Sequence, residues 1–142
     1  MKLVDVNILI YVADRQSQFH SRVLSWWHAS LNGDEIVGLP WISVSGFLRI
    51  ATNPRLFETP LTVEEAVDRV AAWMAQPNVR IVEESSEHWE LFREFVRETG
   101  TGGNRTTDAH LAALAVSRGA TLVSCDTGFA RFRRLRWENP AE

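Results

Sequence analysis

Short apolar runs alternate with amphipathic helical segments along the whole chain, and this alternation restricts the fold more than any other feature. Five runs have the length and residue types of buried strands, at residues 3–4, 36–39, 79–82, 120–124 and, near the end, within 128–137. Segments with apolar residues at helical spacing separate them. Such an alternation predicts an α/β fold with a mainly parallel central sheet of about five strands flanked by helices.

The length of the chain allows one domain. With 142 residues and 45% hydrophobic content, residues 1–142 are predicted to form a single domain with one core. The single cysteine, Cys125, excludes an internal disulfide and fits a reducing compartment. Asp5 and Asn7 interrupt the apolar start, and no run is long enough to span a bilayer. We therefore expect a cytoplasmic protein with no membrane association.

The charge of the chain limits how it could bind nucleic acid. A formal net charge of −3 argues against binding by a uniformly basic surface, so any phosphate contact must be local. Lys2 is the only lysine among the 15 basic residues, and the arginines offer a planar fork that matches phosphate oxygens. Two arginines are candidates for substrate binding: Arg49, beside the second strand–helix unit, and Arg105, at the end of the glycine-rich segment 100–105.

Three aspartates are predicted to meet at one edge of the sheet. Asp5 follows the first strand and Asp126 follows the fourth, while Thr107 or Asp108 is expected to cap the helix that begins there. Crowded carboxylates repel one another, so such a cluster normally binds a cation, and oxygen-only ligands favour Mg²⁺ or Mn²⁺. A hard ion beside a phosphate favours metal-assisted hydrolysis of a phosphodiester.

Four stretches, in their order and spacing, carry a resemblance to a known family. They are VDVNILIYVAD, GLPWISVSGFLRIATNPR, TTDAHLAALAVSRGATLVSCDTGFARF and LRWENP, and together they resemble the PIN-domain nucleases, most closely the VapC-type ribonuclease toxins. The resemblance implies a Mg²⁺-dependent endoribonuclease that acts on RNA, forms homodimers and is inhibited by a VapB-type antitoxin. It also implies that Asp5, Asp108 and Asp126 bind the metal and carry the catalysis, while Asn7 and Ser124 orient them.

The chain departs from the family pattern at Gly46. Many members carry a glutamate there, and a glycine cannot bind a metal, so we expect weaker metal binding, a single ion or an extra water. An alternative is therefore a catalytically impaired PIN-like module that binds RNA or protein. Phosphatases of the haloacid dehalogenase type and response-regulator receivers fit less well, because Asn7 replaces a second acid and Lys2 is the only lysine.

A partner surface is expected where aromatic side chains are exposed. Four tryptophans are candidates for contact with an antitoxin, although tryptophans in a domain of this size are mostly core or dimer contacts: Trp26, Trp27, Trp41 and Trp73.

Overall fold

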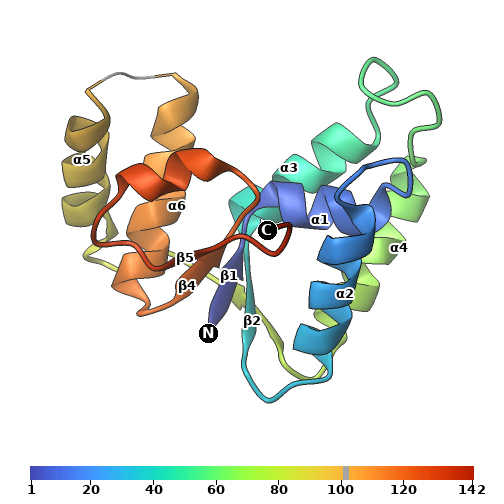
Figure 1. The fold of residues 1–142 in the computed structure, drawn as a ribbon, viewed down its shortest axis with the longest axis horizontal. Coiled ribbons are helices and arrows are strands. Elements are labelled where there is room, and N and C mark those ends of the chain that lie inside the picture. Colours follow the sequence, from blue (N-terminus) through green and yellow to red (C-terminus); the bar gives the residue numbers. More distant parts are fainter. Residues whose placement is uncertain (101–102) are drawn as a thin grey trace.

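Five parallel strands form one central sheet in the computed structural model, which describes residues 1–100 and 103–142 and, for Asn104, the backbone alone. The strand order is β3-β2-β1-β4-β5 (Figure 1). The predicted α/β fold with a parallel sheet is confirmed. The strands are β1 (Lys2–Val4), β2 (Val37–Pro40), β3 (Val79–Val82), β4 (Thr121–Val123) and β5 (Trp137–Glu138).

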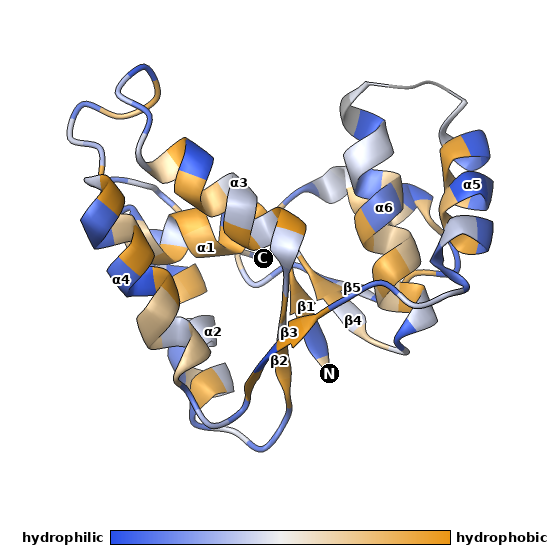
Figure 2. Cartoon of the chain, turned by 180° about the vertical axis from the view of Figure 1, so that it is seen from behind, coloured by the Kyte–Doolittle hydropathy of each residue, from blue (hydrophilic) through white to orange (hydrophobic). Residues whose placement is uncertain are grey.

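Helices cover both faces of this sheet, as Figures 1 and 2 show. They are α1 (Val6–Ala13), α2 (His20–Leu31), α3 (Trp41–Ala51), α4 (Val63–Met74), α5 (His88–Thr99), α6 (Asn104–Ser117) and the 3₁₀ helix η1 (Thr127–Arg131). Helices α1 to α4 share one core cluster, and α5, α6 and η1 share the other. Successive residues of a strand point to opposite faces, so Leu3 joins the second cluster and Val4 the first. No helix of the described chain is long and apolar enough to cross a membrane.

Buried aromatic rings hold α2, α3 and α4 together. The ring centroids of Trp27 and Trp73 are 5.6 Å apart, and those of Phe47 and Trp73 are 4.9 Å apart, both edge to face. The prediction that Trp27 and Trp73 lie on a partner surface is therefore wrong, because both fill the core between packed helices. Trp26 is partly buried and donates to Glu138, whereas Trp41 is half exposed and remains a candidate.

Helix α6 begins earlier than its sequence suggested. Its first residue is Asn104, with Gly103 at the N-cap, so Asp108 lies inside the helix instead of capping it. The predicted cap at Thr107 or Asp108 is wrong, because Gly103 takes the N-cap position with a φ of 71°, which a glycine adopts readily, and the helix starts about one turn sooner. Of the glycine-rich segment 100–105, which ends at the candidate Arg105, residues 101 and 102 lie outside the described residues.

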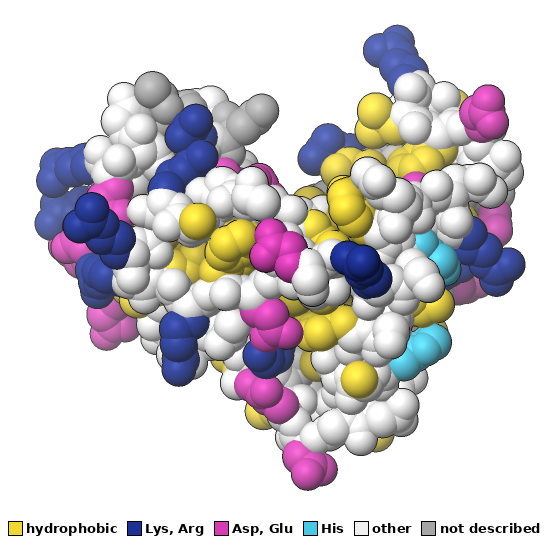
Figure 3. Space-filling model, in the orientation of Figure 1, with side chains coloured by type: hydrophobic (Ala, Val, Ile, Leu, Met, Phe, Trp, Pro, Cys, Tyr) yellow, Lys and Arg dark blue, Asp and Glu magenta, His cyan; other side chains and the backbone are white. Residues whose placement is uncertain are grey.

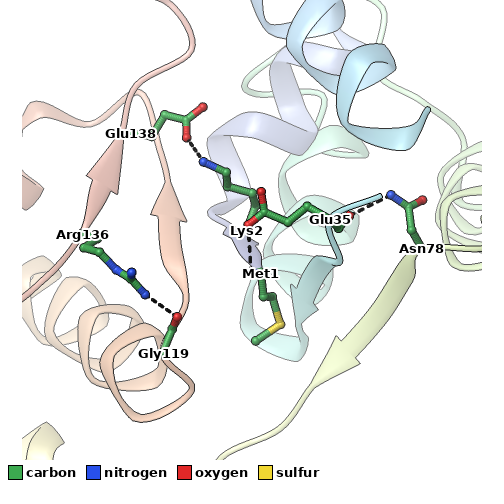
Figure 4. A network of polar contacts seen from close by, with 7 residues as sticks. All are labelled: Met1, Lys2, Glu35, Asn78, Gly119, Arg136 and Glu138. Carbon is green, nitrogen blue, oxygen red and sulfur yellow. Dashed lines mark hydrogen bonds and ion pairs between the residues drawn. The ribbon is translucent and has the colours of Figure 1, made fainter. Parts of the chain in front are cut away.

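Polar contacts join strands and loops near the amino-terminal edge of the sheet, and one of them reaches the end of β5 (Figure 4). The ammonium of Met1 lies 2.9 Å from Glu35, and Lys2, at the start of β1, is paired across β4 with Glu138, the last residue of β5. The pKa of Glu35 is lowered by its hydrogen bond with the terminal amine. Arg136 donates to the carbonyl of Gly119, just before β4. Opposite charges are thus paired along this edge.

Candidate active site

Asp5 marks the point where β1 ends and α1 begins. Its backbone N–H donates to the carbonyl of Val123 at 3.0 Å, which extends the pairing with β4 by one residue. Its carboxylate caps α1, with Oδ1 accepting from the N–H of Val6 at 2.7 Å. The side chain is nonetheless buried, with 7% exposed. The local sequence therefore places a carboxylate in a nearly water-free position at the carboxyl-terminal edge of the sheet.

Ser124 and Asn7 hold the second oxygen of this carboxylate. The hydroxyl of Ser124 donates to Asp5 Oδ2 at 2.7 Å, and the amide of Asn7 donates to the same oxygen at 3.2 Å. Asn7 Nδ2 also donates to Ser124 Oγ at 3.1 Å, and Asn7 Oδ1 accepts from the N–H of Cys125 at 3.1 Å. The structure thus brings three of the predicted residues into direct contact.

The three aspartates act on one another electrostatically. Burial raises the pKa of Asp5 to about 6, against the opposing hydrogen bonds from Ser124 and Val6, and the charges of Asp108 and Asp126 raise it further. The pKa of Asp108 is also raised, by burial and then by Asp126. Asp126 itself is exposed and caps η1, with Oδ1 accepting from the N–H of Gly128 at 2.8 Å. Acids from three separate elements therefore share one electrostatic environment.

A hollow of about 300 Å³ lies between α1, α3 and α6, beside Asp5. Figure 3 shows this side of the molecule notched between its two lobes, with basic side chains on both sides of the notch. Asp108 and Asp126 are not among the lining residues, so they act on Asp5 from outside the hollow. The lining residues are Asp5, Val6, Ile42, Ser43, Ser45, Gly46, Arg49, Thr107 and Leu111.

Gly46 is required by the close packing of α1 against α3. A Cβ at this position would lie 2.9 Å from Val6 Cγ2, a distance that real Cβ atoms do not tolerate. A glutamate therefore does not fit here unless the Val6 side chain or one of the two helices shifts. Arg49, one turn later on α3, is exposed and lines the hollow. Arg105, on α6, is close enough to lower the pKa of Asp108.

The donor set suits a hard divalent ion. The acidic and amide side chains around Asp5 offer oxygen atoms as metal ligands, and no histidine is among the described residues that line the hollow. Within residues 1–100 and 103–142, no three His, Cys, Asp or Glu side chains lie close enough together to hold one ion jointly. Mg²⁺ usually keeps several of its waters and needs only one or two carboxylates, so these residues fit Mg²⁺ better than an ion that demands a full protein cage.

Sequence reasoning missed a polar chain that joins α5 to α6 behind Asp108. Glu84 Oε1 lies 3.2 Å from His110 Nε2, and His110 Nδ1 lies 2.9 Å from His88 Nε2. Burial lowers the pKa of both histidines. The four-residue spacing of Glu84 and His88 was the only signal, and nothing in the sequence connects them to His110. This chain supports the helix that carries Asp108.

Arg131 was also missed, although it follows Asp126 by only five residues. Its charge lowers the pKa of Asp108 more than that of Arg105 does. The proximity of Arg131 to an acid at a strand end was the available signal.

The sequence of this chain is similar to that of known proteins over nearly its whole length. The model of the PIN domain family matches residues 2–135. Ribonuclease VapC37 of Mycobacterium tuberculosis is 40% identical over 140 residues, which are 99% of this chain and 97% of that protein. Ribonuclease VapC43 of the same species is 39% identical over 142 residues, covering 100% and 97%.

Solved structures share the fold at lower identity. VapBC-1 from nontypeable Haemophilus influenzae superposes with a TM-score of 0.72 at 16% identity, covering 99% of this chain and 98% of that one. VapBC2 from Rickettsia felis, bound to a DNA fragment from its promoter, gives a TM-score of 0.69 at 17% identity and covers 97% of each chain.

Proposed function

This chain belongs to the PIN domain family, among the VapC-type ribonucleases, and from that premise we propose that it is a Mg²⁺-dependent endoribonuclease and the toxin of a type II toxin–antitoxin pair. The observation that carries the proposal is the carboxylate of Asp5. It is buried at the carboxyl-terminal edge of the sheet, held by two polar side chains, and influenced by two further acids. Such an arrangement costs stability unless a cation binds there.

In this proposal Asp5 and Asp108 bind the ion directly, and Asp126 contacts it through water. Mn²⁺ is the expected substitute. The bound ion would lower the pKa of a water molecule bound to it and would polarise the phosphodiester. Ser124 and Asn7 hold Asp5 in one orientation, so that the carboxylate does not have to be ordered when the substrate binds.

The substrate in this proposal is RNA, bound next to the hollow. Arg49 lies on the α3 side of the hollow and Arg105 on the α6 side, so the two guanidinium groups could contact phosphates on either side of the bond that is cut. An RNA substrate also implies that the protein works in the cytoplasm.

The proposed partners are a VapB-type antitoxin and a second copy of this chain. Structural neighbours such as VapBC-1 and VapBC2 are toxin–antitoxin complexes, which supports the first of these. Trp41 is half exposed in a largely apolar groove of about 540 Å³ between α3 and α4, and it is the candidate contact for the antitoxin.

Gly46 favours a second function, in which the fold binds RNA without cutting it. The reason is that a glycine cannot bind a metal ion where many family members carry a glutamate.

The decisive experiment incubates the purified protein with a panel of RNAs in Mg²⁺ or Mn²⁺ and then with a chelator. We expect cleavage that the chelator stops. Asp108→Asn should lower it by more than about 100-fold, since even residues that only orient a metal ligand cost 10–100-fold. Asp68→Asn, on the exposed side of α4, is the matched control and should cleave like the wild type. Binding without metal-dependent cleavage would support the second function instead.

A further inference from the structure

A glycine turn folds Arg131 back toward the acid that precedes it. A Cβ on Gly128 would lie 3.0 Å from Asp126 Oδ1 and 3.1 Å from Arg131 Nη2, so both groups lie next to the same point of the turn. This turn is the start of η1, which follows β4 at the carboxyl-terminal edge of the sheet (Figure 1). The guanidinium group therefore lies at the acid cluster, although it comes from the outer end of η1.

Arg131 lies near a second acid as well, since its charge opposes the burial of Asp108 on α6. No hydrogen bond or ion pair joins Arg131 to another side chain in the part of the chain that the structure describes, and its side chain is exposed. Other arginines are tied down: Arg134 pairs with Glu94, for example. The guanidinium of Arg131 is therefore close to the acids yet keeps its donors for a ligand.

The charges of the cluster indicate what that ligand is. Three carboxylates outweigh the two positive charges of one divalent ion, so a phosphate approaching the loaded site would still meet net negative charge. A guanidinium next to Asp108 and Asp126 removes that obstacle, and its planar fork matches two phosphate oxygens. Arg105 comes from the same helix as Asp108, whereas Arg131 comes from a different element and lies close to Asp126 as well.

We propose that Arg131 contacts the phosphate of the RNA next to the bond that is cut, holding it against the metal-binding acids. The inference rests on the proposed function and adds to it a substrate-contacting residue. A simpler role would be to neutralise the acids in the absence of metal. The two roles differ in what the loss of Arg131 does to RNA binding and to metal binding.

The test compares Arg131→Gln with Arg133→Gln, an exposed arginine two residues later, as the matched control. The affinity for a short, fluorescently labelled, unstructured RNA is measured with Ca²⁺ in place of Mg²⁺, between about 50 and 200 mM salt. Loss of one phosphate contact should reduce the slope of log affinity against log salt by about 0.7 for a single strand. We expect this change in Arg131→Gln and not in Arg133→Gln.

Kinetics in Mg²⁺ supply the second measurement. Arg131→Gln should lower kcat/KM by about 10- to 100-fold, the cost of a lost charge-assisted hydrogen bond. Arg131→Lys should keep the salt slope and lose less activity, because it retains the charge but not the fork. An unchanged salt slope in Arg131→Gln, with tighter Mn²⁺ binding by calorimetry, would overturn the proposal in favour of charge neutralisation.

The proposed function can fail separately. If the wild type binds RNA but does not cut it, the nuclease proposal fails, while the salt slope of Arg131→Gln still decides whether Arg131 contacts phosphate. If the wild type binds no RNA at all, both proposals are wrong.

Discussion

The two edges of the sheet arrange their charges in opposite ways. Near the amino-terminal edge, the charges that start the chain are paired: the terminal ammonium with Glu35, and Lys2, at the start of β1, with Glu138, at the end of β5 (Figure 4). At the carboxyl-terminal edge, burial and the charge of Asp126 raise the pKa values of Asp5 and Asp108, and no ion pair joins any of the three aspartates to a basic side chain within the described chain.

The backbone does not cause this difference, because every parallel strand contributes one end to each edge. The residues at the strand ends cause it. Pairing at one edge costs the protein little, whereas a buried, unpaired carboxylate at the other lowers stability until a cation binds. The amino-terminal edge therefore stabilises the fold, whereas the carboxyl-terminal edge gives up some stability so that it can bind a cation.

Ser124→Ala should have the largest effect, because it breaks the arrangement that holds Asp5. Ser124 is fully buried and contacts Asp5, Asn7 and the N–H of Asp126. We expect a loss of RNA cleavage of about 10- to 100-fold, the usual cost of losing a group that orients a metal ligand. Initial rates in Mg²⁺ measure it, with thermal unfolding to show that the variant folds. Ser25→Ala, on the exposed side of α2, is the control. Equal loss in both variants would contradict a specific role for Ser124.

Gly46→Ala tests how tightly the carboxyl-terminal edge is packed. The new Cβ would press against Val6 Cγ2, so we expect a loss of about 1–3 kcal/mol of unfolding free energy from overpacking. Urea unfolding measures this loss. Adding Val6→Ala should relieve the contact, so that the double variant is more stable than the sum of the single effects. Simple additivity would show that α1 and α3 can separate, and that a glutamate at this position would have fitted.

Asp5→Asn should stabilise the protein at neutral pH when a chelator removes any metal. The folded pKa of about 6 is higher than the ordinary 3.8, so the folded state binds the proton more tightly than the unfolded one. The wild type is therefore favoured below pH 3.8 and loses stability as the pH rises from there to about 6, by at most about 3 kcal/mol. The asparagine loses one acceptor of a backbone hydrogen bond, so the net gain above pH 6 is about 1–2 kcal/mol.

Urea unfolding of wild type and Asp5→Asn across this pH range measures the effect. The advantage of Asp5→Asn should disappear in acid, where the variant becomes the less stable of the two by the cost of the lost hydrogen bond. Asp34→Asn, in the exposed turn before β2, should show no such pH dependence. A difference that is the same at every pH would mean that burial does not raise the pKa of Asp5.

The sequence was most informative where the determining pattern is local. The alternation of apolar runs and helices predicted the sheet, and the position of Asp5 and Asp126 after strands predicted the edge on which they lie. The start of α6 was not predictable, because Gly103 and Thr107 are both acceptable caps and only the fold decides between them. The orientation of Trp27 and Trp73 likewise depends on how α2 and α4 pack. The position of Arg131 close to the acids depends on a turn whose path no local pattern specifies.

Lys2→Met, at the amino-terminal edge, should have the smallest effect. Its pairing with Glu138 is partly exposed, so solvent screens it and its loss should cost no more than about 1 kcal/mol. That cost should shrink in about 1 M salt, where the screening length falls to about 3 Å. Glu138→Gln, which keeps an acceptor for the indole of Trp26, should behave in the same way. RNA cleavage should be unchanged in both variants, because neither residue contacts the acid cluster. A loss of cleavage without a loss of stability would show that the two edges are coupled through β1, and that the contrast between them does not separate stability from function.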